Sequence, residues 1–399
     1  MSENAVLGPG VCAGLGTANT MHLACEALGM ALPGSTPVRA NSAPMWDAVE
    51  RAAERIVTLV DEDLRPRDIL TPAAFGNAVM TILSVSGSIN SVKHLQAVAA
   101  EAGCAADVYR LFEQLADSVP LLTAIRPNGT HPIERFEDAG GTRAVMKQLE
   151  SLLHVDALTL TGRTVGENLA GVTVADEEII RPVGRALGHR PTIVLIRGSL
   201  APDGGIVKLA VSDDRELEFT GPARVYDSPA EALAAVRAGQ VIRGDVVVLR
   251  GQGPTGSPGM GMASQLVFSL DGAGLTGQVA VVTDGQLSGL VNKGIVVGEV
   301  SPEAAAGGPL ALVADGDPIR IVVLGRVADL DVPAAELAGR RAGLAAPPES
   351  GERGWLSIYQ RLVRPLPEGA VLSPATDAAG PAGGTGYATS STSPWATSP

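Results

Sequence analysis

Apolar residues recur at helical spacing along the first 180 positions of the chain. Glycine and proline separate these segments, as they do between short helices. The predicted helices cover residues 20–31, 46–61, 68–87, 92–103, 108–117 and 142–154. The N-terminal part of the chain, over 1–182, is therefore predicted to be mostly helical.

After about Pro182 the pattern changes to short runs of β-branched residues separated by turns, which is typical of strands. These runs are TIVLIRG, IVKLAVS, ELEFTGPARVYD, GDVVVLRG, QVAVVTDG, GIVVGEVS and RIVVLG. One predicted helix, over 228–239 with Ser228 as its N-cap, interrupts the strands, and another over 331–344 closes them. The pattern predicts an α/β protein whose β-rich C-terminal domain covers 183–365.

The last segment, PATDAAGPAGGTGYATSSTSPWATSP, is rich in Gly, Ala, Ser, Thr and Pro. Such a composition buries too little apolar surface to order itself. We therefore predict a disordered tail over 366–399 and exclude it from the fold.

The composition limits the partners and the location of the protein. Hydrophobic residues make up 45 % of 399 residues, which is enough for two domains with cores of their own. A net charge of -13 repels a phosphate backbone, so we expect no nucleic-acid partner. No apolar run approaches the roughly 20 residues that span a bilayer, and the N-terminus MSENAV lacks the features of a signal peptide. The expectation is no membrane partner and a cytoplasmic location.

The three cysteines are Cys12, Cys25 and Cys104, an odd number at wide spacing that suits a reducing compartment. Glycines surround Cys12, and a predicted helix follows it. A thiolate beside a helix N-terminus has a lowered pKa and is a good nucleophile or metal ligand. A lone cysteine is also often a small buried hydrophobe, and composition leaves both interpretations open.

Ser288 lies in VVTDGQLSG, a predicted strand that runs into a glycine-flanked turn. Such a turn can present a hydroxyl near backbone N–H groups that stabilise an oxyanion. The stretch is not a G-x-S-x-G nucleophile elbow, because Leu287 and Gln286 separate Ser288 from Gly285. The alternative is an ordinary turn residue.

Other polar stretches carry weaker signals. The backbone amides of GQGPTGSPGMGM, over 251–262, can cradle an anion. The stretch lacks the Lys and Ser/Thr of a P-loop, so taken alone it is interpreted as an ordinary loop. His94 sits at helical spacing among apolar residues, which favours a half-buried structural histidine. A solvated surface is the expected environment of His131, Glu134, Glu137 and Asp138.

Taken together, these stretches resemble the dihydroxy-acid and sugar-acid dehydratases, a family that includes 6-phosphogluconate dehydratase. ENAVLGPGVCAGLGTANTMHLACEALGMALPGS is similar to the segment around the family's third cluster cysteine, C-G-G-M-x-T-A-N-T-M followed by EALGM-x-LPGS. The match continues in family order, from about Glu3 to about Pro347, through SVSGSINSVKHLQAVAAEAG, HPIERFEDAGGTRAVMKQL, LTLTGRTVGENLA, IRGSLAPDGGIVKLA, FTGPARVYDS, GDVVVLRGQGPTGSPGM, VVTDGQLSG and VGEVSPEAAAGGPLALVADGD.

The resemblance implies a hydro-lyase with a 2Fe-2S cluster on three cysteines and a Mg2+ ion, in which a serine alkoxide removes the C2 proton of the substrate. Iron and magnesium act as Lewis acids in such a site. By the same resemblance, Cys12 is one cluster ligand and Ser288 is the catalytic serine. It also implies a truncated α/β N-terminal domain followed by a barrel-like C-terminal domain.

The sequence departs from the family pattern in three places. The family's other two cluster cysteines and its Asp-Lys pair precede the third cysteine, whereas only eleven residues precede Cys12. The family's metal-binding glutamate lies 26 residues before the serine, and Met262 occupies that position here. A thioether does not replace a carboxylate on Mg2+. Gln252 likewise stands where an acidic residue is common in the family.

Two hypotheses follow, and both include a protein partner and an oligomer. In the first, the chain is the C-terminal subunit of a split dehydratase for a 2,3-dihydroxy or sugar acid, and a second polypeptide supplies the missing ligands. In the second, it is a non-catalytic relative that acts as an interaction or regulatory subunit, for example with a full-length dehydratase. A gene fragment or misplaced start codon is a third interpretation.

Overall fold

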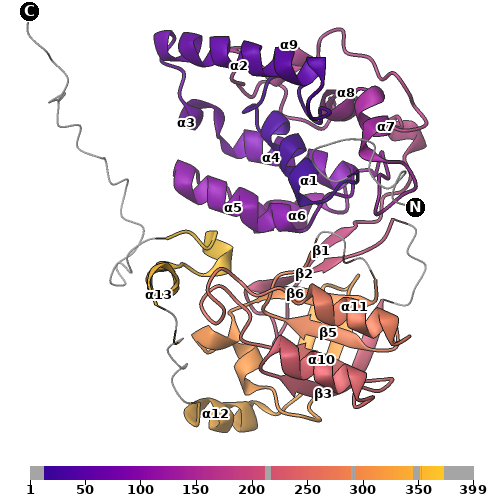
Figure 1. Ribbon diagram of the computed structural model, residues 1–399, viewed down its shortest axis with the longest axis vertical. Helices are drawn as coiled ribbons and strands as arrows, with labels where there is room; N and C mark the ends of the chain where they lie inside the picture. The colour runs from indigo at the N-terminus through magenta and orange to yellow at the C-terminus, as the bar shows by residue number, and fades with distance from the viewer. Residues whose placement is uncertain are drawn as a thin grey trace, which may run out of the picture.

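The computed structural model describes residues 13–211, 217–288, 291, 293–344, 351 and 353–372. Helices form the upper half of the molecule in Figure 1, and a sheet with its own helices forms the lower half. The helices of the upper half are α1 (Thr17–Ala27), α2 (Ala43–Asp61), α3 (Pro66–Ile69), α4 (Pro72–Ser84), α5 (Asn90–Ala102), α6 (Val108–Leu115), α7 (Ile133–Asp138), α8 (Gly141–Gln148) and α9 (Val165–Leu169).

A single mixed sheet of eight strands, in the order β1-β2-β6-β5-β4-β3-β7-β8, builds the lower half. Its strands are β1 (Ile193–Ile196), β2 (Gly204–Lys208), β3 (Glu218–Tyr226), β4 (Val246–Leu249), β5 (Ala280–Thr283), β6 (Ile295–Ser301), β7 (Pro318–Val322) and β8 (Val327–Leu330). Strands β3, β4, β5 and β6 run parallel, and the other pairs are antiparallel. The crossovers between the parallel strands carry α10 (Pro229–Arg237) and α11 (Ser264–Gly272).

The two edges of the sheet meet, so the sheet is a nearly closed barrel. Arg197, which follows β1, forms a parallel bridge with Val327 at the start of β8. The amide of Arg197 donates to the Arg326 carbonyl over 3.0 Å, and the amide of Ala328 donates to the Arg197 carbonyl over 2.7 Å. Because closure pairs the backbone groups of both edges, it removes exposed edge strands.

The central strands are buried on both faces, which explains their continuous apolar sequence. Val246 and Val248 of β4 belong to the cluster that fills the barrel. Val247 and Leu249, which point the other way, pack with α10 and α11 on the outside.

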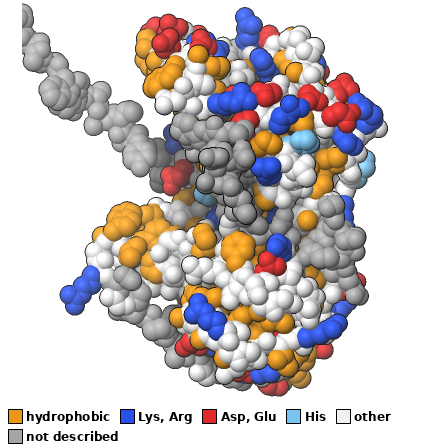
Figure 2. All heavy atoms as spheres, turned by 45° about the vertical axis from the view of Figure 1, so that its right-hand side comes forward, with side chains coloured by type: hydrophobic (Ala, Val, Ile, Leu, Met, Phe, Trp, Pro, Cys, Tyr) orange, Lys and Arg blue, Asp and Glu red, His pale blue; other side chains and the backbone are white. Residues whose placement is uncertain are grey.

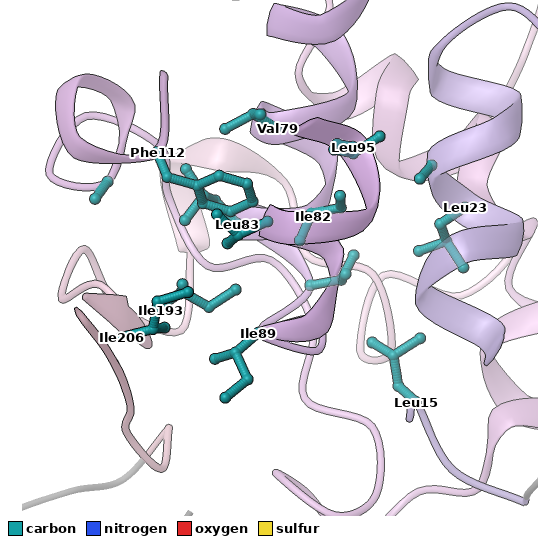
Figure 3. Packing of buried hydrophobic residues seen from close by; sticks show 14 of the residues in the cluster. Leu15, Leu23, Val79, Ile82, Leu83, Ile89, Leu95, Phe112, Ile193 and Ile206 are labelled. Atoms are coloured by element: carbon teal, nitrogen blue, oxygen red, sulfur yellow. The ribbon is translucent and has the colours of Figure 1, made fainter. Parts of the chain in front are cut away.

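This outer cluster continues without a break into the helical half. Figure 3 shows Phe112 of α6 beside Leu83 of α4, with Ile193 of β1 and Ile206 of β2 close by. The side chains of Phe112, Ile193 and Ile206 are fully buried. One apolar core therefore joins the helices to the barrel and fixes how the two halves meet.

Most elements predicted from the sequence are present. All seven β-branched runs overlap a strand, and the Ser228 side chain caps α10 by accepting from the Glu231 amide. The prediction missed β8 and the helices α7, α9, α11 and α13 (Trp355–Leu362).

The predicted start of the tail at residue 366 is wrong for its first residues. Leu366 opens a short 3-10 helix, η5 (Leu366–Glu368), and is only 5 % exposed. Gly369 lies so close to Ala97 of α5 that a Cβ there would approach the Ala97 backbone to 2.9 Å. Residues 373–399 lie outside the described part of the chain.

None of the described helices combines the length and apolar character that a membrane span requires. On the face shown in Figure 2, Lys and Arg side chains are interspersed with Asp and Glu over the helical half. The described part of this face therefore offers no uniform basic surface to a polyanion.

Phe112 tests the shared core. We expect Phe112→Ala to lower the free energy of unfolding by about 3–5 kcal/mol, because it leaves a cavity where α6 meets β1. Phe268→Ala is the matched control, since Phe268 is 48 % exposed and its loss should cost under about 1 kcal/mol. Urea denaturation measures both, and equal losses would contradict the assignment of Phe112 to the core.

Glu26 of α1 is a buried carboxyl that ties this helix to the loop after it. It accepts hydrogen bonds from the amides of Gly34 (2.8 Å) and Thr36 (3.1 Å) and from the Thr36 hydroxyl (2.5 Å). Burial raises the pKa of Glu26 to about 7, although these donors and the nearby Arg143 charge oppose the shift. Between about pH 4.5 and pH 7, this carboxyl is therefore protonated in the folded chain and ionised in the unfolded chain.

The raised pKa of Glu26 makes stability fall as the pH rises. From about pH 4.5 to about pH 7 the folded state binds more protons than the unfolded state, so the unfolding free energy should drop by about 3 kcal/mol. Glu26→Gln should remove the Glu26 share of this fall, while Glu101→Gln on the surface should keep it. Urea denaturation at about pH 4.5 and pH 7 measures the fall, and a fall in Glu26→Gln equal to that of the parent chain would contradict the expectation.

Candidate active site

Ser288 lies on the loop that leaves the carboxyl end of β5. Its amide donates to the Ser264 hydroxyl at the start of α11 over 2.7 Å, and its carbonyl accepts from the Val291 amide over 3.0 Å. The side chain of the preceding Leu287 is buried and anchors the loop, whereas Ser288 is half-buried. The loop therefore holds a serine at the end of a parallel strand, where ligands commonly bind in such sheets.

Met262 runs beside this loop. It forms a parallel bridge with Gln286, and the adjacent Gly261 carbonyl and Ala263 amide hydrogen-bond the Gln286 backbone over 2.9 and 3.0 Å. Met262 is 51 % exposed, which is unusual for a methionine in a folded domain. The structure thus brings Met262 and Ser288, which the family spacing relates, to the same strand end.

Two buried carboxylates shape the glycine-rich loop at residues 251–262. Asp284, which follows β5, accepts from the amides of Gly251 (3.1 Å), Gln252 (2.8 Å) and Ala304 (2.9 Å). Burial raises the pKa of Asp284, as does the charge of Glu303, while these three donors oppose the shift. The amides of the loop are therefore occupied by the protein's own carboxylate.

Glu303, which is 8 % exposed, accepts from the amides of Thr255 and Gly256 over 2.9 Å each. Gly253 packs against the Glu303 side chain so closely that any Cβ would overlap it. The glycine-rich stretch is therefore a loop whose amides bind the protein's own carboxylates, which agrees with its interpretation as a loop and leaves no open anion cradle at these amides.

A cavity of about 240 Å³ lies where α5 meets this loop. Lys93 and His94 line it from α5, Gln286 from the serine loop and Tyr359 from α13. Burial lowers the pKa of His94, and the Lys93 charge lowers it further. His94 is therefore a partly exposed, weakly basic imidazole at a cavity wall, which differs from the half-buried structural histidine predicted from the sequence.

Lys93 connects this cavity to the barrel. Its ammonium pairs with the carboxylate of Glu299 on β6, and it also donates to the Asn90 side chain over 2.5 Å. The Glu299 amide in turn donates to the Gly285 carbonyl over 3.0 Å, just before the serine loop. Sequence reasoning missed this pair, because 206 positions separate its members.

The four polar residues around α7 differ in their exposure. Asp138 pairs with Arg39 at the surface and His131 is exposed, so the prediction of a solvated surface is confirmed for these two residues. It is wrong for Glu134 and Glu137, which are partly buried, and burial raises the pKa of Glu137. Cys12 lies outside the described residues. Cys25 and Cys104 are free thiols on or beside helices.

The described residues do not fit the cofactors that the resemblance implies. Among residues 13–211, 217–288, 293–344 and 353–372, no three or more His, Cys, Asp or Glu side chains form a group that could hold a metal ion. Asp284 and Glu303 are occupied by backbone amides, and Met262 offers only a thioether. A cluster or a Mg2+ ion would need ligands from outside these residues.

Comparisons with known proteins cover both halves of the chain. Residues 1–168 match the family model for the dihydroxy-acid/6-phosphogluconate dehydratase N-terminal domain, and residues 178–370 match the model for the corresponding C-terminal domain. The dihydroxy-acid dehydratase of Caldicellulosiruptor saccharolyticus is 40 % identical over 374 residues, covering 93 % of this chain and 67 % of the relative. Dihydroxy-acid dehydratase 1 of Methanosarcina acetivorans is 41 % identical over 369 residues, covering 92 % and 66 %. The chain thus spans about two thirds of the length of these relatives.

Asp284 tests how the site is held. In Asp284→Asn the amide group offers fewer acceptors, so at least one buried N–H loses its partner, at a cost of about 1–3 kcal/mol. We expect lower stability and faster backbone amide hydrogen exchange over 251–256. Asp331→Asn, at an exposed position, is the control. Unchanged exchange over 251–256 would show that Asp284 does not hold the loop.

Proposed function

This chain belongs to the dihydroxy-acid/6-phosphogluconate dehydratase family, and from that membership we propose that it serves a hydro-lyase reaction on a 2,3-dihydroxy or sugar acid. In such a reaction a base removes the proton from C2, the C3–O bond breaks and the hydroxyl leaves as water. The resulting enol becomes a 2-keto acid. The observation that carries the proposal is the match of both halves of the chain to the family's two models.

Ser288 is the proposed base of this reaction. Its loop is anchored at Leu287 and by the Ser264 hydroxyl, which limits the positions its side chain can take. A serine hydroxyl is a weak acid, and a nearby metal ion lowers its pKa toward the range of a usable base. Because the described residues hold no metal-binding group, such an ion would need ligands from outside them.

The cavity beside the serine loop supports a small acid as substrate. Its volume of about 240 Å³ suits a small molecule. Lys93, His94 and Tyr359 provide N–H and O–H groups along its wall, which suit the oxygens of a hydroxy acid.

A second polypeptide is the proposed source of ligands that the described residues do not supply. The surface of α2 supports a protein partner, because none of its 19 residues is buried although its apolar face is wide. Trp46, Val57 and Val60 are 54 %, 64 % and 77 % exposed, and a groove of about 760 Å³ lined mostly by apolar side chains runs along the helix. Exposed apolar surface of this extent is typical of a protein interface.

A non-catalytic role is the second candidate, and Met262 is the observation that favours it. This thioether stands beside the serine loop, where the family carries a carboxylate, and Gln252 is likewise uncharged. In that case the chain keeps the fold and acts as an interaction or regulatory subunit of another dehydratase.

Anaerobic co-purification of the tagged full chain from its host distinguishes the two candidates. A partner rich in cysteine and acidic ligands, about two irons per complex, and formation of 2-keto acid from a 2,3-dihydroxy acid support the hydro-lyase. An iron-free complex that forms no 2-keto acid from dihydroxy or sugar acids supports the non-catalytic role.

Ser288→Ala tests the base within such a complex. We expect 2-keto acid formation to fall by at least about a hundredfold, the usual contribution of a positioned acid-base group, with the partner still bound. Ser118→Ala, at an exposed helix end, should keep full activity. Full activity of Ser288→Ala would reduce Ser288 to a turn residue.

A further inference from the structure

Lys208, at the end of β2, is a lysine inside the protein core. The residue is only 3 % exposed. Its ammonium donates to the Ser86 carbonyl over 2.9 Å, to the Ser86 hydroxyl over 2.9 Å and to the Gly87 carbonyl over 2.7 Å. An ammonium has three N–H donors, so these three oxygens use all of them.

No carboxylate among the described residues forms an ion pair with Lys208, and burial lowers the pKa of Lys208 to about 7. Burying an amine carries a desolvation cost, which its hydrogen bonds to Ser86 and Gly87 offset. The hydrogen bonds of Lys208 are therefore directed at the turn that begins with these two residues.

A positive charge stabilises this turn because of its place in the fold. The turn follows the C-terminus of α4, where the last helix carbonyls lack intrahelical partners and the helix dipole has its negative end. Ser86 has a φ of 53°, in the left-handed region that a serine rarely adopts. Hydrogen bonds from Lys208 to both the carbonyl and the hydroxyl of Ser86 hold it in this conformation.

The same turn fixes the first turn of α1. The Ser88 amide donates to the Thr20 hydroxyl over 3.0 Å, and the Ser88 and Thr17 hydroxyls are 3.0 Å apart. The Asn90 side chain donates to the Thr17 hydroxyl over 2.8 Å. A Cβ on Gly87 would lie 2.9 Å from the Thr20 methyl, so the turn sits tightly on α1.

A serine next to a lysine is also the arrangement of a nucleophile and its base. Here Ser86 is fully buried and Lys208 is 3 % exposed, so a substrate has no access to either side chain. The pair therefore serves structure and not catalysis.

We infer that Lys208 is a positioning residue of the barrel that sets the turn at 86–90 and, through Ser88 and Asn90, the N-terminus of α1. The inference does not depend on the proposed reaction, because it concerns contacts within the chain.

Hydrogen exchange of the full-length chain tests this role. We expect Lys208→Met to speed amide exchange at least tenfold over 86–92, where its hydrogen-bond acceptors lie, and over 17–23, which the turn at 86–90 contacts. Exchange in β4 should not change. Lys208→Gln, which keeps two N–H donors, should give a smaller effect at the same two segments.

Lys293→Met is the matched control, since Lys293 is exposed and pairs with Asp271. It should leave exchange over 17–23 and 86–92 as in the parent chain. If Lys208→Met does not fold, Lys208→Gln decides by the same measurement. Unchanged exchange at the two segments, or an equal increase in β4, would overturn the inference.

Discussion

The burial of the parallel strands β4 and β5 on both faces is the constraint on which the rest of the structure depends. One face fills the barrel and the other packs under α10 and α11, so neither strand can move without opening two cores. The serine loop, the glycine-rich loop and Asp284 all leave the carboxyl ends of these strands. A rigid frame therefore carries loops whose positions are set by the strands beneath them.

The contacts that join the helical half to this frame are of two kinds. Apolar packing, such as that of Phe112 against β1, is non-directional and leaves the relative rotation of the halves loosely defined. The amines of Lys93 and Lys208 add direction, since each needs particular oxygens on the opposite half. Polar contacts of this kind select one arrangement among several that bury similar area.

Several parts of this fold could be predicted from the sequence, and the reasons are local. The seven β-branched runs are strands because strands buried on both faces need continuous apolar sequence, and Ser228 caps α10 because its hydroxyl reaches an amide three residues on. VADL of β8 has only a weak alternation of apolar and polar residues, and α11 is a short helix between glycine-rich turns. Neither segment shows a clear periodicity of apolar residues. Long-range pairs such as Lys208 with Ser86, 122 positions apart, have no local pattern at all.

The candidate site was predictable only in part, for the same reason. Ser288 and Met262 could be related through the spacing of the resembled family, and the structure brings them to one strand end. His94 and the cavity beside it arise from the meeting of α5, the serine loop and α13, three segments far apart in the chain. At this site the protein uses its buried carboxylates, Asp284 and Glu303, to hold backbone amides. Carboxylates that accept hydrogen bonds from two or three backbone amides are poorly placed to bind a metal ion, so a metal centre beside Ser288 would require ligands other than Asp284 and Glu303.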